Sequence, residues 1–231
     1  MSERFLALAT DYDGTIATHG VVDAETVEAL RRARRGGLKL ILVSGRELES
    51  LESVFDEFDV FDLMVLENGG LLYEPATRRE RPLCDPPPPA LVERLRARGV
   101  AQLSVGRVII ATVEPHEDEV LHEIRDLGLE HQIIFNKGSV MVLPPGVNKS
   151  TGLKEALKEL GIAPERTAAV GDAENDHALL ELCGIGAAVA NALPSLKEHA
   201  DIVTEGRHGA GVAELIDRLL ANDTAARGPM H

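Results

Sequence analysis

The first part of the chain alternates hydrophobic runs with helical spacings. Apolar runs at 5–9, 38–43 and 63–66 are typical of buried strands. Asp23 is a candidate N-cap for a helix that runs to about Arg35, and apolar residues at 48, 51, 54 and 55 predict a second helix. This βαβαβ order predicts a parallel sheet with right-handed crossovers, followed by a small hairpin formed by 71–73 and 81–83.

A proline run at 85–89 breaks this rhythm and predicts a stiff connector into an inserted module. Inside the module the pattern predicts a helix, a strand, a helix and two hairpin strands, at 90–98, 105–113, 117–127, 132–135 and 139–143. The turn Asn136-Lys137-Gly138 joins the last two strands, and Pro144-Pro145-Gly146 marks the exit. The module is therefore expected to be a small α+β layer.

After the insert the alternating pattern resumes. It predicts helices at 150–160, 175–182, from Pro194 onward and at 212–220, with strands at 167–170, 186–189 and 202–203. The predicted fold class is α/β, with a Rossmann-like parallel sheet core and an inserted α+β cap domain. The expected boundaries are 1–82 for the first part of the core, 83–146 for the cap, 147–222 for the rest of the core, and 223–231 for a flexible tail.

Composition narrows the setting of this 231-residue chain. Aromatic residues make up only 3% and tryptophan is absent, so the core must be aliphatic, as suits a parallel sheet flanked by helices. A net charge of −14 disfavours nucleic acid and anionic membranes as partners. The two cysteines stand in unrelated contexts, and no apolar run approaches the length of a membrane span. We therefore expect a cytoplasmic location.

Four polar segments follow predicted strands or begin a helix beside one. They are Asp11-Tyr12-Asp13, Ser44-Gly45-Arg46, Asn148-Lys149 and Gly171–Asp176. The carboxyl ends of parallel strands lie at one edge of a sheet, so these segments are expected to meet there. Crowded carboxylates need a cation between them, and oxygen ligands of this kind suit Mg²⁺.

A nucleophilic carboxylate, a hard cation, a lysine and hydrogen-bond donors together describe phosphoryl transfer. Each piece alone has an ordinary explanation. Ser44-Gly45 could be a plain turn, Lys149 a solvated helix start, and Asp172 and Asp176 could cap the helix that follows. The histidines have no ligand-like grouping and are expected to be surface or helix residues: His116, His177, His199 and His208.

The joint pattern resembles a known family. Asp-x-Asp-Gly-Thr, Ser-Gly-Arg, Lys and Gly-Asp-x-x-Asn-Asp, in this order, resemble the four motifs of the haloacid dehalogenase (HAD) superfamily of phosphohydrolases. The insert resembles the C2-type cap of the Cof-type (IIB) branch. It is short, as in the compact phosphoglycolate and sucrose-phosphate phosphatases.

The resemblance implies a role for each motif residue. Asp11 would be the nucleophile, and Asp13 the general acid–base that also lends its backbone carbonyl to Mg²⁺. Asp172 would complete the metal ligands, Asp176 would support it, and Lys149 would pair with the nucleophile and the phosphate. The residues implied in substrate or phosphate binding are Ser44, Gly45, Arg46 and Asn175.

The function implied is a Mg²⁺-dependent phosphatase that hydrolyses a small phosphorylated metabolite, either phosphoglycolate or a sugar phosphate, through an aspartyl phosphate. The alternatives are a sugar phosphomutase on the same core and a receiver-type phospho-acceptor module. Arg107, Lys137 and His116 are cap residues that could meet an anionic substrate. The sequence does not indicate an oligomeric state.

Overall fold

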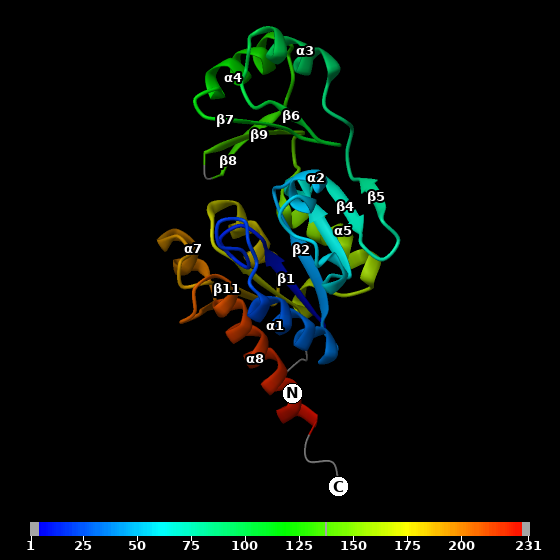
Figure 1. Cartoon of the computed structure of the whole chain (residues 1–231), viewed down its shortest axis with the longest axis vertical. Helices are drawn as coiled ribbons and strands as arrows, with labels where there is room; N and C mark the ends of the chain where they lie inside the picture. Colours follow the sequence, from blue (N-terminus) through cyan, green and yellow to red (C-terminus); the bar gives the residue numbers. More distant parts are fainter. Residues whose placement is uncertain (1–4, 137, 228–231) are drawn as a thin grey trace.

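The computed structural model describes residues 5–136 and 138–227. Figure 1 shows an elongated molecule with two units: a large sheet flanked by helices, and a smaller sheet at the end opposite α8. The chain leaves the large unit after β5 and returns to it before α5, so the small unit is an insertion. This is the predicted α/β architecture with an inserted α+β module.

The large sheet has eight strands in the order β12-β11-β10-β1-β2-β3-β4-β5. The pairs from β12 to β3 are parallel, and β4 and β5 are added antiparallel. The strand bounds are β1 Ala7–Asp11, β2 Lys39–Val43, β3 Leu63–Leu66, β4 Leu71–Glu74, β5 Arg79–Pro82, β10 Thr167–Gly171, β11 Ile185–Ala188 and β12 Ile202–Val203.

Helices cover both faces of this sheet. Their bounds are α1 Ala24–Arg35, α2 Leu48–Glu52, α5 Lys149–Leu160, α6 His177–Leu182, α7 Pro194–His199 and α8 His208–Arg227, with short 3₁₀ turns η1 Phe58–Val60, η2 Glu67–Gly69, η3 Pro164–Arg166 and η4 Glu174–Asp176. Helix α1 packs along α8, while α5 lies against β3 and α6. Residues 223–227, which we expected in a flexible tail, belong to α8; residues 228–231 lie outside the described part.

The aliphatic core sits between the sheet and these helices. The central strands β1 and β10 are buried throughout, as expected for strands covered on both faces. Asp23 caps α1 as predicted, its Oδ1 accepting from the Thr26 amide at 2.7 Å. No helix in the described part of the chain is long and apolar enough to span a membrane.

The small unit is a four-stranded antiparallel sheet, ordered β6-β7-β9-β8, with two helices on it. Its elements are α3 Pro89–Ala97, β6 Ser104–Val105, β7 Ile110–Val113, α4 Glu117–Asp126, β8 Gln132–Asn136 and β9 Ser139–Leu143. The single strand predicted over 105–113 is wrong: β6 and β7 are separate strands joined by a turn at 106–109. The amides of Val108 and Ile109 donate to a side chain of the large unit instead of to a strand partner.

Candidate active site

The fold brings the four polar segments to one edge of the large sheet. Asp11 is the last residue of β1 and pairs in register with Val43, so Ser44 follows directly beside it. On the other side β1 pairs with β10, which ends at Gly171 just before Asp172. Lys149 is the first residue of α5, which is capped by Asn148 and Thr151. The predicted convergence at the carboxyl ends of the strands is therefore what the structure has.

Lys149 lies at the centre of this edge and is only 2% exposed. Its Nζ contacts Asp11 Oδ1 and Asp176 Oδ1, each at 2.6 Å. Burial alone lowers the pKa of a lysine, but the two carboxylates outweigh it and hold the pKa of Lys149 above its ordinary value. Lys149 is therefore a fully charged, fixed cation and not the solvated helix residue of the ordinary explanation.

Asp11 is crowded by like charges. Burial, together with the nearby Asp176 and Asp172, raises the pKa of its carboxyl from 3.8 to about 7 against the opposing pull of Lys149. Asp176 is anchored by the amides of Asp172 and Ala173, which donate to its Oδ2 at 2.9 and 3.1 Å. A site that makes its own carboxylate hard to ionise is suited to a further cation.

The donor chemistry fits a hard divalent ion. Asp11, Asp172 and Asp176 each offer a carboxylate oxygen, and the three atoms lie within 4.8 Å of one another. Thr15 Oγ1 donates to Asp172 Oδ1 at 3.4 Å and orients it. Oxygen ligands of this kind suit Mg²⁺. The side chain of Asp13 does not belong to this group.

Asp13 instead binds Arg46. The guanidinium donates from Nε and Nη2 to the two carboxylate oxygens at 2.6 and 2.8 Å, a bidentate pair. The hydrogen bond to Asp13 raises the pKa of Arg46, whose guanidinium also lies over the Tyr12 ring at 5.5 Å. Arg46, predicted to bind substrate, thus orients the predicted acid–base residue.

The remaining predicted residues lie around Ser44. Ser44 is buried, and its Oγ accepts from the Arg46 amide at 3.2 Å. Asn175 Nδ2 donates to Asn68 Oδ1 at 3.4 Å, and the other amide atoms, Asn68 Nδ2 and Asn175 Oδ1, are buried without a partner. These two atoms are hydrogen-bonding groups that a ligand could use.

A cavity of about 480 Å³ opens over Asp11 and Asp13, between the two units. The large unit contributes acids, Arg46 and small polar groups, whereas the described residues of the small unit that line the cavity are all uncharged. The lining residues are Asp11, Asp13, Gly45, Arg46, Glu47, Ser50, Ser104, Ile109, Ala111, Ser139 and Met141. We call the core side of the cavity, which carries the charged residues, its floor, and the side formed by the described cap residues its roof.

Sequence reasoning missed two residues that hold the loop after Asp13. Asn191 Nδ2 and His208 Nδ1 both donate to the Gly14 carbonyl, at 2.8 and 2.9 Å. The His208 amide donates to Asn191 Oδ1 at 2.7 Å. His208, expected as an ordinary surface or helix residue, therefore supports the site. His208 lies far from Gly14 along the sequence, so no local sequence pattern could predict this contact.

Two of the three cap residues named as candidate substrate contacts, Arg107 and His116, do not line the cavity. Arg107 pairs with Glu49 and Glu80, both at 2.7 Å. His116 Nε2 accepts from the Ala101 amide at 3.1 Å. Lys137 lies outside the described residues. Among the described residues, the part of the cap that lines the cavity is formed by other, uncharged side chains.

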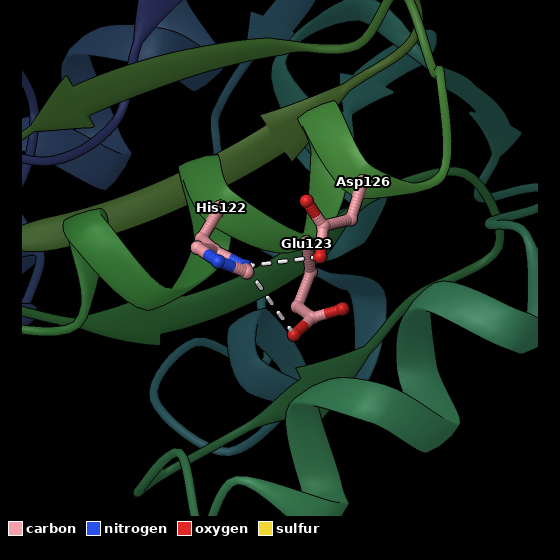
Figure 2. A group of neighbouring side chains, drawn as sticks. All are labelled: His122, Glu123 and Asp126. Carbon is pink, nitrogen blue, oxygen red and sulfur yellow. Dashed lines mark ion pairs between the residues drawn. The ribbon is translucent and has the colours of Figure 1, made fainter.

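A second group of possible metal ligands lies on α4 of the cap, far from the cavity. Figure 2 shows His122, Glu123 and Asp126, with His122 Nδ1 at 3.8 Å from Glu123 and 3.4 Å from Asp126. Arg94 and Arg98 already pair with Glu123, and Arg98 also contacts His122. This group is a neutralised surface ion-pair network rather than a cation site.

The sequence matches the family of haloacid dehalogenase-like hydrolases over residues 8–83 and 99–216. It is 33% identical to phosphoglycolate phosphatase 2 of Saccharolobus solfataricus, covering 94% of each chain. It is also 33% identical to a phosphoglycolate phosphatase of Methanothermobacter thermautotrophicus, covering 93% of this chain and 98% of that one.

The fold agrees with a solved structure described as a HAD subclass IIB sugar phosphatase. The TM-score is 0.72 at 21% identity, covering 92% of this chain and 98% of the other. The predicted family is therefore confirmed, and the receiver-type alternative falls away. The chain belongs to the haloacid dehalogenase-like hydrolases and is a phosphatase of that family.

Proposed function

We propose that this phosphatase hydrolyses a small phosphorylated metabolite with Mg²⁺, through an aspartyl phosphate on Asp11. The observation that carries the proposal is the buried bridge of Lys149 between Asp11 and Asp176, beside a cavity that Asp13 also lines. The two relatives named phosphoglycolate phosphatases support phosphoglycolate as the first substrate to test. A sugar phosphate is the second.

In the first step, a carboxylate oxygen of Asp11 attacks phosphorus and the bond to the leaving oxygen breaks. Asp13 gives its proton to that oxygen, so the product leaves with a hydroxyl group and not as an alkoxide. In the second step, Asp13 takes a proton from water, the water oxygen attacks the phosphorus, and Asp11 is released together with phosphate. Arg46 orients Asp13 in its ionised form, ready to take the proton from water, and one of the two hydrogen bonds has to open when Asp13 carries the proton for the first step.

Several residues hold the phosphoryl group during these steps. Lys149 supplies a fixed positive charge, and Ser44 and the Gly45 amide supply donors beside Asp11. The carboxylates of Asp11 and Asp172 and the backbone carbonyl of Asp13 would hold Mg²⁺. When bound, the ion supplies positive charge against the phosphoryl oxygens and lowers the repulsion among these carboxylates.

The cavity limits the size of the substrate. A volume of about 480 Å³ lies within the range for small-molecule sites, and the cap covers it. The described cap residues that line the cavity carry no charge, so we expect them to select the leaving group by shape and hydroxyl contacts. We therefore expect free metabolites to be substrates and folded phosphoproteins to be excluded.

The two carboxylates of the first motif can be separated by trapping the phosphoenzyme. Asp11→Asn should abolish turnover and all labelling by a radioactive phosphomonoester. Asp13→Asn should slow turnover by about 10²–10⁴-fold while still forming phosphoenzyme, with a smaller loss for an aryl phosphate, whose leaving group needs little protonation. Labelling of Asp11→Asn but not of Asp13→Asn in a rapid-quench experiment would reverse the roles.

A sugar phosphomutase on the same core remains the second candidate, because the phosphoenzyme on Asp11 could pass its phosphoryl group to a sugar hydroxyl. A phosphomutase would isomerise a sugar phosphate in the presence of a bisphosphate and release little inorganic phosphate. A panel of phosphorylated metabolites assayed for both products decides between them. We also propose the cytoplasm as the compartment, on the sequence evidence alone.

A further inference from the structure

Glu67 is a buried carboxylate that the proposed mechanism does not use. It lies at the start of η2, directly after β3, and is 1% exposed. Three backbone amides of the cap turn at 106–109 donate to it. Arg107 donates to Oε1 at 2.8 Å, and Val108 and Ile109 donate to Oε2 at 2.7 and 3.0 Å. One core side chain therefore binds a whole turn of the cap.

The backbone on both sides is shaped for this contact. Glu67 and Asn68 adopt left-handed conformations, with φ of 52° and 55°, which are uncommon for residues other than glycine. A Cβ on Gly106 would lie 2.6 Å from Glu67 Oε1, and a Cβ on Gly70 would lie 2.8 Å from Val108. The turn can approach the carboxylate only because both positions are glycine.

The same short segment is tied to the proposed phosphate site. The Glu67 amide donates to the Arg46 carbonyl and the Asn68 amide to the Ser44 carbonyl, both at 3.0 Å. On the cap side, the turn is flanked by Ser104 and ends at Ile109, and both residues line the cavity. Ser104 also donates to Glu47 at 2.5 Å. Glu67 thus connects the roof of the cavity to its phosphate-binding floor.

We propose that Glu67 is a positioning residue that fixes the turn at 106–109 on the core, so that Ser104 and Ile109 form a constant wall against the leaving group. The proposal rests on the proposed phosphatase function. It attaches the backbone of the turn to the core, besides the two chain connections and the side-chain contacts of Ser104 with Glu47 and of Arg107 with Glu49 and Glu80. Without it, the wall is held by those exposed or partly buried side chains alone, and the enzyme loses its preference for a small leaving group.

Two variants remove the contact from opposite sides. Glu67→Gln places an amide NH₂ where an acceptor is needed, and Gly106→Ala inserts a methyl group against the carboxylate. Glu80→Gln is the matched control, because Glu80 binds the Arg107 side chain on the same turn and lies outside the cavity. All three are made in the full-length protein with Mg²⁺ present, and their folding is checked by circular dichroism.

Hydrogen exchange measures the contact without reference to activity. In the unsubstituted protein, the amides at 107–109 should exchange as slowly as those of β7. Hydrogen bonds to a charged group are strong enough that losing one should speed exchange about 10- to 100-fold in Glu67→Gln and Gly106→Ala, and not in Glu80→Gln. Fast exchange in the unsubstituted protein, or no change in the two variants, overturns the proposal. If Glu67→Gln does not fold, Gly106→Ala carries the test.

Kinetics measure the positioning role. In both variants KM for phosphoglycolate should rise about tenfold with kcat within about threefold, because the reacting groups are untouched, while KM for a bulkier aryl phosphate should change little. Suppose that amide exchange at 107–109 becomes faster but the ratio of kcat/KM for phosphoglycolate to that for the aryl phosphate does not change. Glu67 would then hold the turn without affecting the choice of substrate, and the positioning role would be wrong. If the unsubstituted protein releases no phosphate from any substrate, the proposed function fails, and the exchange data still decide the contact.

Discussion

Replacing Asp11 by asparagine is expected to stabilise the fold in chelator while abolishing turnover. The carboxyl of Asp11 is buried beside Asp172 and Asp176, and burial is the main reason that its pKa rises from 3.8 to about 7. Lys149 opposes this rise without cancelling it. The ionised carboxylate of Asp11 therefore destabilises the folded state, and asparagine removes that destabilisation.

The sign and size follow from the pKa. Below about pH 4 the carboxyl is neutral in both states and costs nothing. As the pH rises, the unfolded chain ionises first, and the folded protein loses stability until its own carboxyl ionises near about 7. Each pKa unit corresponds to about 1.4 kcal/mol, so the loss is about 1–2 kcal/mol at about pH 5 and up to about 4 kcal/mol at about pH 8.

Thermal unfolding of both proteins in chelator tests this. Each kcal/mol moves the Tm of a chain of this size by about 2–4 °C, so Asp11→Asn should melt higher by a margin that widens between about pH 5 and about pH 8. Asp13→Asn is the control, because it also removes a carboxylate from this edge, but one that is partly exposed, paired with Arg46 and outside the group of Asp11, Asp172 and Asp176, so its loss should not raise the Tm. A lower Tm for Asp11→Asn at the higher pH, or a gap that does not grow, would refute the reasoning.

Three further outcomes are expected. Phosphatase activity should vanish in chelator and return with Mg²⁺ but poorly with Ca²⁺, whose looser coordination would misplace Asp11; full activity in excess chelator would contradict the metal site. Asn191→Ala should raise the Mg²⁺ concentration for half-maximal activity by about tenfold, because it loosens Gly14 next to Asp13, and an unchanged value counts against that support. Gly152→Ala should cost about 1–3 kcal/mol in denaturant unfolding, since its Cβ would lie 2.6 Å from Gly69 Cα; an unchanged midpoint would show that the helix can shift.

The sequence predicted the sheet and the meeting of the motifs because both follow from local patterns. A hydrophobic run followed by polar residues defines the end of a strand, and parallel order places such ends at one edge. The sequence alone therefore predicts that Asp11, Ser44 and Asp172 lie together at one edge of the sheet. The contact of Lys149 with Asp11 was also accessible, because the resemblance named that partner, whereas its contact with Asp176 was not predicted.

What escaped prediction depends on contacts between distant segments. The run at 105–113 has the composition of a strand, yet its middle is a turn because Glu67 binds the amides there. His208 and Asn191 reach Gly14 from the last part of the chain. The pairing of Arg46 with Asp13 likewise depends on the three-dimensional neighbourhood, and neither residue signals it locally. Periodicity carries no information about such partners.

The two connections between core and cap differ in what they control. The exit connection, 144–148, is held by Gln132, whose side chain donates to the Val147 carbonyl at 2.7 Å, and it ends one residue before Lys149. Gly69 lies so close to Asn148 that a Cβ there would be 2.0 Å from its carbonyl oxygen. The entry connection leads only to α3 of the cap, and Asp85 and Pro86 are exposed.

Insertions should therefore be tolerated in the entry connection and not in the exit connection, where each added residue would displace Lys149 from Asp11 and Asp176. A graft of a foreign cap, or the natural replacement of one cap by another over evolution, has to preserve the length of 144–148 while the proline connector can vary. Of the two connections between core and cap, the entry connection is thus the one at which a cap can be exchanged without a fixed linker length.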